Sequence, residues 1–144
     1  MHIRDGVGQT EAHMLHKELT QRVINAAKAV HSDLGPGLTR VLYTRALEIE
    51  LRELGLMAEV DKPVQVRYRG QNIGELGCDV CVDNAILVIC VESPETRPEE
   101  YGRLRTLLKN LELEVGLLLN FNGARLDIRR VEAVTKNKET AAAE

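Results

Sequence analysis

Apolar residues recur every three or four positions in the first quarter of the chain, a spacing that predicts one buried face of an α-helix. The residues of this face are Leu15, Leu19, Val23, Ala27 (or Ala26), Val30 and Leu34. The pattern ends at Gly35-Pro36-Gly37, where glycine accepts the left-handed conformation of a helix cap and proline cannot continue the hydrogen-bond ladder. A second helix is predicted from about Leu38 to Leu54, with Gly55 as its stop.

The apolar period then changes to two, which is the period of a β-strand with one buried face. The first predicted strand covers 64–68 and turns at Arg69-Gly70-Gln71-Asn72. A second strand is predicted over 77–82, and the apolar run 85–91 predicts a third strand that is buried on both faces. Such a strand belongs in the middle of a sheet that helices cover.

A helix is predicted to begin at Pro98, and its apolar face is Tyr101, Leu104, Leu107, Leu108 and Leu111. The short apolar strand 115–120 follows this helical crossover, so it should pair parallel to strand 85–91. Asn122-Gly123 is a hairpin signal that leads into a last strand over 124–131. The predicted order is ααβββαββ, an α/β fold with a mixed sheet of four to five strands flanked by helices.

The two ends of the chain lack this periodicity. Residues 1–12 are polar and irregular, and residues 135–144 show no apolar spacing, so we expect both segments to be disordered. A chain of 144 residues is about one domain, and no repeat or linker divides it. We therefore expect a single domain over 13–134.

The composition is that of an ordinary globular protein, with 44% apolar and 28% charged residues. Only 3% are aromatic, which leaves few platforms for stacking single-stranded bases, and a net charge of -3 gives no bulk attraction to nucleic acid. The longest apolar run is far below the roughly 20 residues that span a bilayer, and residues 1–10 lack a signal-peptide run. We expect a cytoplasmic protein with no membrane partner.

Three cysteines without an export signal predict reduced thiols, because a disulfide framework needs an even number in an exported chain. Cys78 and Cys81 form a C-x-x-C motif on a predicted strand. On a regular strand an offset of three points the two side chains to opposite faces. We therefore expect structural cysteines and no metal site at this motif.

Four stretches of the chain resemble one family of small bacterial proteins. They are V-I-N-A-A-K-A-V-H-S-D-L-G-P-G-L, L-R-E-L-G-L, V-x-Y-R-G and G-L-L-L-N-F-N-G-A-R-L. Together with the element order, they resemble the GxxExxY family, whose members are similar to the PD-(D/E)XK nuclease superfamily. The resemblance covers about residues 15–132 and implies a PD-(D/E)XK nuclease-like (restriction-endonuclease-like) core.

The resemblance also implies where nuclease chemistry would lie. In that superfamily an Asp on one strand and a Glu-x-Lys on the next hold Mg²⁺ and activate water, since residues two apart on a strand face the same way. The family's Asp matches Asp79, but its Glu and Lys fall on Ile89 and Val91. The Glu that names the family falls on Arg40, and the Gln of the later helix falls on Arg103. Only the Asp is retained.

These replacements predict a protein with no catalytic residues, no metal site and no cofactor. One Asp is a poor site for a hard divalent cation, which needs several oxygen ligands. We expect Arg40 and Arg103 to pair with Asp79 in place of the missing cation. The alternative is a residual Mg²⁺-dependent nuclease in which Glu92, re-aimed by a bulge at the end of its strand, joins Asp79.

Phosphate contacts give a further alternative. Arg40, Arg103, Arg125 and Arg129 are the candidate nucleic-acid-binding residues, although a solvated strand face is the favoured explanation of the last two. His31 ends the first helix, where capping or packing is its expected role. The sequence favours, in order, a non-catalytic protein that self-associates as a homo-oligomer or binds a protein partner, a nucleic-acid-binding protein, and a nuclease.

Overall fold

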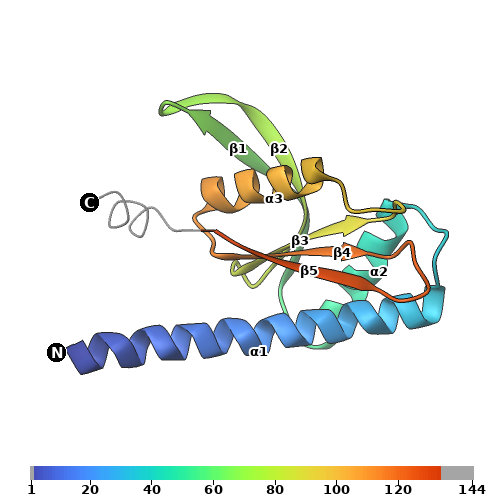
Figure 1. Cartoon of the computed structure of the whole chain (residues 1–144), viewed down its shortest axis with the longest axis horizontal. Coiled ribbons are helices and arrows are strands. Elements are labelled where there is room, and N and C mark those ends of the chain that lie inside the picture. The colour runs from blue at the N-terminus through green and yellow to red at the C-terminus, as the bar shows by residue number, and fades with distance from the viewer. Residues whose placement is uncertain (1, 134–144) are drawn as a thin grey trace.

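The computed structural model describes residues 2–133, with side chains from His16 onward. Within these residues the chain forms three helices and five strands in the predicted order (Figure 1). They are α1 (His2–Leu34), α2 (Arg40–Glu53), β1 (Ala58–Tyr68), β2 (Gln71–Val82), β3 (Ile86–Val91), α3 (Pro98–Leu111), β4 (Val115–Asn120) and β5 (Asp127–Glu132).

The strands form one mixed sheet in the order β1-β2-β3-β4-β5. Three neighbouring pairs are antiparallel, and β3 pairs parallel with β4. The parallel pair is the one joined through α3, because a helical crossover returns the chain to the same end of the sheet. This topology confirms the predicted mixed sheet and the parallel pairing of the two central apolar strands.

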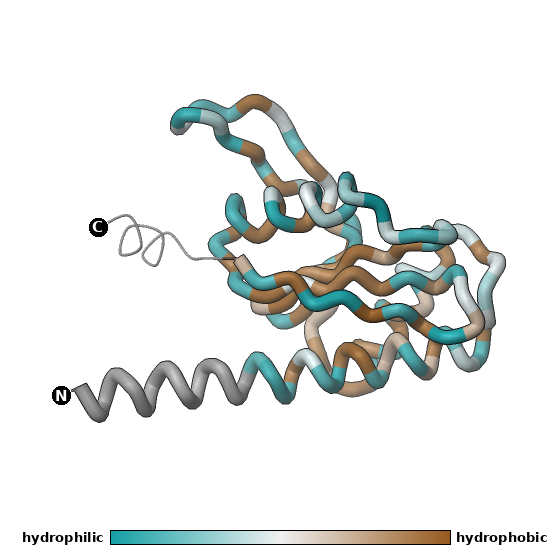
Figure 2. The backbone as a smooth tube through the Cα atoms, viewed as in Figure 1, coloured by the Kyte–Doolittle hydropathy of each residue, from teal (hydrophilic) through white to brown (hydrophobic). Residues whose placement is uncertain are grey.

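Each face of the sheet carries its own buried apolar cluster, because β3 and β4 are buried along their whole length. Helices α1 and α2 cover one face, where Tyr43, Leu47 and Phe121 are fully buried. Helix α3 covers the other face with Leu104, Leu107 and Leu108. Figure 1 shows the sheet between α1 and α3, and Figure 2 shows the hydrophobic residues concentrated along its central strands.

The turn between α1 and α2 is held by Tyr43. Its hydroxyl donates to the carbonyl of Gly35 at 2.6 Å and accepts from the amide of Leu38 at 3.1 Å. The Tyr43 ring stacks on Phe121 with ring centroids 4.3 Å apart. His31 Nε2 lies 2.9 Å from the carbonyl oxygen of Gly123, so His31 packs at the end of α1, as predicted.

Helix α1 is longer than expected. It begins at His2, so the prediction of an irregular segment over 1–12 is wrong for the residues described there. Once a helix is nucleated, each added residue contributes a backbone hydrogen bond, and this continues α1 beyond its apolar stripe. The tail predicted over 135–144 lies outside the described residues.

Three strand boundaries also differ from the prediction. β2 begins at Gln71 instead of Gly77. β1 begins at Ala58 instead of Val64, because Asp61 (φ 57°) and Pro63 interrupt the apolar alternation that would have marked it. β5 begins at Asp127 instead of Ala124. None of the helices in the described part of the chain combines the length and hydropathy needed to cross a membrane.

The β1–β2 hairpin is the longest unit of the sheet and rises clear of it beside α3 (Figure 1). Its β2 residues from Cys78 to Val82 are buried, whereas the distal residues from Gln71 to Glu75 are exposed. Two large apolar side chains are uncovered there, Tyr68 at 61% and Ile73 at 66% exposure. The sheet therefore ends in a projecting arm on the α3 side.

Candidate functional site

Asp79 lies on β2 at the point where β2 and β3 separate. The ladder between these strands pairs Val82 with Ile86 and ends at Val80 and Val88. One residue further, the Asp79 carboxylate accepts the amide hydrogen of Cys90 at 3.0 Å. A side-chain oxygen thus replaces the strand carbonyl that would otherwise satisfy this buried N–H group.

Two guanidinium groups complete the surroundings of Asp79. Arg40, the first residue of α2, places Nε at 3.0 Å and Nη2 at 2.9 Å from Oδ2 of Asp79. Arg103 of α3 places Nη2 at 3.5 Å from Oδ1 and donates to the carbonyl of Gly77 at 2.7 Å. The predicted pairing of both arginines with Asp79 is therefore present.

Glu100 adds a fourth charge that the sequence analysis missed. It lies in the first turn of α3, 3.6 Å from Arg40 Nη1 and 3.9 Å from Arg103 Nη1. Two carboxylates and two guanidinium groups thus form a network whose formal charges cancel, here called the Asp79 network. The i, i+3 spacing of Glu100 and Arg103 on one helix was the available signal.

The Asp79 network lies at the surface between α2 and α3, with Asp79 as its most buried member. The Asp79 side chain is 12% exposed, against 31% for Arg40 and 25% for Arg103. Charge-assisted hydrogen bonds of this kind are stronger than neutral ones, and they occupy the carboxylate oxygens that a metal ion would need. The arrangement joins two helices to the sheet.

Residues 17–131, most of the chain, match the family model described as the PD-(D/E)XK nuclease superfamily. The chain belongs to the PD-(D/E)XK nuclease superfamily. No curated protein and no solved structure matches it.

A nuclease of this superfamily needs Mg²⁺ beside its Asp, and the residues present here do not fit that ion. Ile89 and Val91, the positions that the resemblance predicts for the Glu-x-Lys pair, are 0% and 4% exposed and pack in the apolar cluster beneath α3. In the part of the chain that the structure describes, no three His, Cys, Asp or Glu side chains are grouped to hold a metal. The arginines beside Asp79 would also repel a cation.

Glu92, the alternative metal ligand, follows directly after β3 and is exposed to solvent. Over residues 16–133 its carboxylate forms no ion pair with the arginines around Asp79 and no ligand cluster with Asp79 itself. Exposure at the end of a strand is explained by solvation alone. The structure therefore does not bring these two acids together as a site.

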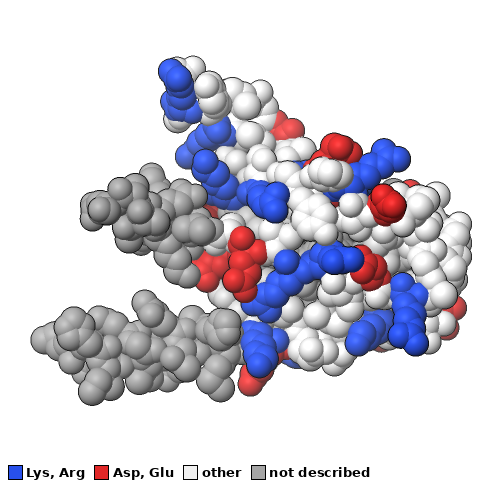
Figure 3. Space-filling model, viewed as in Figure 1, with Lys and Arg blue, Asp and Glu red and all other residues white. Residues whose placement is uncertain are grey.

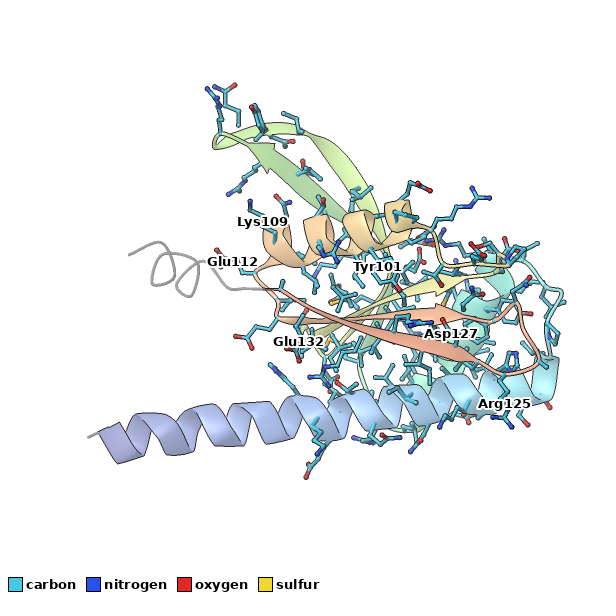
Figure 4. All side chains as sticks on the ribbon, viewed as in Figure 1. Tyr101, Lys109, Glu112, Arg125, Asp127 and Glu132 are labelled. Carbon is cyan, nitrogen blue, oxygen red and sulfur yellow. The ribbon has the colours of Figure 1, made fainter. Side chains whose placement is uncertain are left out.

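Two of the arginines proposed for phosphate contact lie at the opposite side of the sheet. Arg129 is on the edge strand β5, where its Nε donates to Asp127 at 3.1 Å. Arg125 precedes β5 and lies beside the C-terminal end of α1 (Figure 4). Because β2 and β5 are separated by two strands, these residues and the Asp79 network do not form one surface.

The three cysteines are free and buried. Cys78 and Cys81 pack in the same cluster, so the prediction of opposite faces is wrong; the strand loses its alternation at Asp79. Burial, reinforced by the neighbouring Cys81, raises the pKa of Cys78 from 9.0 to about 12. Burial raises the pKa of Cys90 to about 12 as well. Protonated, enclosed thiols of this kind are poor nucleophiles.

Proposed function

We propose that this chain is a non-catalytic member of the PD-(D/E)XK superfamily, of the GxxExxY type, that acts in the cytoplasm by binding itself or a protein partner. One observation carries the proposal. The single retained acid, Asp79, is engaged by two guanidinium groups and by the Cys90 amide, and the neighbouring catalytic positions hold hydrocarbon.

Conversion of this arrangement into a metal site would cost free energy at each step. Asp79 would have to release Arg40, whose guanidinium would lose its closest partner. The amide of Cys90 would share its acceptor with the ion. Mg²⁺ would then find water in place of a second carboxylate, although its protein sites in phosphoryl chemistry commonly use more than one protein or substrate oxygen. The ion pair is the favoured state.

The outer side of α2 supports the self-association form of the proposal. Val41, Leu42 and Ile49 are 64%, 50% and 59% exposed. Single exposed apolar residues are ordinary, but several on one helix are typical of a surface that another molecule covers. A symmetric homo-oligomer that uses the same patch twice is the simplest such assembly.

The catalytic part of the proposal is tested with purified protein, plasmid DNA and single-stranded DNA and RNA, in the presence of Mg²⁺ or Mn²⁺. We expect no metal-dependent cleavage, and no Mn²⁺ binding by calorimetry. Asp79→Ala is the matched control, because it removes the only retained acid. Cleavage by the native chain that this substitution abolishes would overturn the proposal.

The self-association part is tested by size-exclusion chromatography with light scattering at micromolar concentration. We expect an oligomer that Ile49→Glu dissociates, because a buried unpaired carboxylate opposes association. Arg125→Glu, a charge change at an exposed residue outside α2, should have the smaller effect. A strict monomer would remove the homo-oligomer and leave binding of a different protein as the function.

Nucleic-acid binding through Arg40 and Arg103 is the weaker alternative. Both guanidinium groups already contact Asp79 and Glu100, so a phosphate would have to compete with two fixed carboxylates. Phosphate contacts also make binding fall steeply with salt. Gel shifts at low ionic strength that weaken with Arg40→Ala would support this alternative instead.

A further inference from the structure

A groove of about 630 Å³ lies between the distal half of the β1–β2 hairpin and the C-terminal end of α3, far along α3 from Glu100 and the Asp79 network. Its lining comes from three parts of the chain that are distant in sequence. They are the distal part of the β1–β2 hairpin from Val66 to Ile73, the end of α3 with the residues directly after it, and Ala133. The volume is in the range of roughly 300–1,000 Å³ that specific ligand sites occupy.

The groove exists because α3 is shorter than the hairpin beside it. Val64 of β1 packs under α3 with Leu104 and Leu107. Val66, on the same face of the strand, lies where the helix is ending, and it lines the groove. An apolar strip of the hairpin thus continues past the helix that covers its first part, and Tyr68 at its end is 61% exposed.

The two walls of the groove are fixed relative to each other. The amide of Arg67 donates to Oδ1 of Asn110 at 3.0 Å, and Asn110 Nδ2 donates to the carbonyl of Thr106 at 2.9 Å. One hydrogen bond therefore joins the hairpin to α3, and the second, within α3, orients the Asn110 side chain that accepts it. A groove that is already shaped in this way loses less entropy when a ligand binds.

The charges around the groove are positive and unneutralised. Arg67, Arg69 and Lys109 are exposed, and within residues 16–133 none of them takes part in an ion pair, whereas Glu112 is the single acid of the lining. Figure 3 shows Lys and Arg side chains running from the hairpin over α3, and Figure 4 places Lys109 on the side of α3 toward the hairpin. By contrast, the arginines of the Asp79 network are paired.

This combination of an apolar floor and free cations identifies the chemistry of the ligand. Nucleic acid would satisfy the cations, but Tyr68 is the one aromatic side chain of the lining, so stacking platforms for successive bases are lacking. An extended peptide alternates its side chains between two sides, so it places apolar residues on the floor while acidic residues meet the cations.

We propose that this groove binds an extended segment of a partner protein in which acidic and apolar residues alternate. The proposal rests on the proposed function, because it names the surface through which a non-catalytic chain engages its partner. Arg67, Arg69 and Lys109 pair with the acidic residues, and Val66 and Tyr68 contact the apolar ones.

Fluorescence anisotropy of the full chain tests the proposal with three labelled probes. They are a peptide alternating Glu and Val, the same peptide with Lys in place of Glu, and a single-stranded oligothymidylate. We expect the acidic peptide alone to bind. Arg69→Glu combined with Lys109→Glu should weaken it at least about tenfold, and Tyr68→Ala should weaken it without changing its salt dependence. Arg125→Glu, an exposed arginine outside the groove, should leave the affinity unchanged.

Any other result of these binding measurements contradicts the assignment of the groove as a peptide-binding site. No binding of the acidic peptide, or equal weakening by Arg125→Glu, would remove the groove as a peptide site, and selective binding of oligothymidylate would assign it to nucleic acid. Circular dichroism of each variant confirms that it is folded. These outcomes are separate from the nuclease assay, so absence of both cleavage and peptide binding would overturn the groove and leave the non-catalytic function standing.

Discussion

Asp79 has a structural task that is visible at the scale of one side chain. Its carboxylate closes the gap left when β2 and β3 separate, and it links the sheet to α2 and α3 through Arg40 and Arg103. Loss of such a group leaves a buried amide without its acceptor and leaves Glu100 as the one carboxylate beside both arginines. The stability of the chain should therefore depend on this acid.

We expect Asp79→Ala to lower the free energy of unfolding by about 2 kcal/mol, less than the roughly 3–5 kcal/mol of a fully buried pair because both arginines are partly exposed. Asp79→Asn keeps an acceptor for the Cys90 amide, so about 1 kcal/mol is expected. Urea unfolding followed by circular dichroism measures both. A gain in stability, as expected when an isolated acid leaves a metal site, would contradict this account.

The buried thiols give the chain a pH dependence on the alkaline side. The folded-state pKa of Cys78 and of Cys90 is raised to about 12, while the unfolded chain releases these protons near the ordinary value of 9.0. Between these values the unfolded state binds fewer protons, so stability falls as pH rises; below about 9 the contribution is fully retained.

We therefore expect the urea midpoint to fall as the pH rises above about 9 toward 12, and less so in a variant carrying Cys78→Ala and Cys90→Ala. Alkylation by iodoacetamide, followed by mass spectrometry, gives the second measurement. The folded chain should stay unmodified where the unfolded chain reacts. Rapid alkylation of either cysteine in the folded chain would show that these thiols are accessible.

The sequence predicted part of the Asp79 network, and the reason is chemical. Opposite charges at positions that resemble one family site implied that Arg40 and Arg103 would meet Asp79. The Cys90 contact was not predictable, because its donor is a backbone amide and residue type says nothing about it. The contacts of Glu100 and the groove were not predicted either, since both depend on how α3 lies against distant parts of the chain.

At the scale of elements, α3 and β4 approach each other most closely at Gly116. A Cβ atom there would lie 2.7 Å from Cδ1 of Leu104, closer than real contacts allow. Leu104 is fully buried, so it has little room to move aside. The helix sits at this depth because the strand below it has no side chain at that position.

We expect Gly116→Ala to cost about 1–3 kcal/mol through overpacking. The matched control is Gly102→Ala on the exposed side of α3, where nothing lies within 4 Å. That substitution should stabilise the chain by about 0.5–1 kcal/mol, because alanine favours a helix interior over glycine. Thermal and urea unfolding measure both, and equal effects of the two variants would refute the close contact.

The element order was predictable because periodicity is local. A period of three to four residues marks the buried faces of α2 and α3, and a continuous apolar run marks β3, which is buried on both faces. The parts of the helices and strands that were not predicted lack this apolar pattern. Residues 2–12 of α1 continue a helix without an apolar stripe, and the early part of β1 is broken by Asp61 and Pro63.

At the scale of the whole molecule, two apolar clusters share a single sheet. Leu47 of α2 belongs to one cluster and Leu107 of α3 to the other, and both are fully buried. Each central strand contributes alternate residues to both clusters, so neither can be lost without disturbing the other. The two faces should therefore unfold together.

We expect Leu47→Ala and Leu107→Ala each to cost about 2–5 kcal/mol and to shift one common transition. Circular dichroism reports the helices, and tyrosine fluorescence reports Tyr43 and Tyr101 on opposite faces of the sheet. The two probes should give the same midpoint in every variant. Separate midpoints for the two signals would show that the faces are independent.

The Cys90 amide that bonds to Asp79 bears on how enzymes of this architecture lose their chemistry. Under the proposed function, an acid that also joins two strands would be retained by the folding requirement once its hydrolytic partners were exchanged for aliphatic groups. The presence of such an acid in a chain then indicates that the fold was inherited. Assignments of activity are safer when they rest on the companions of such an acid than on the acid itself.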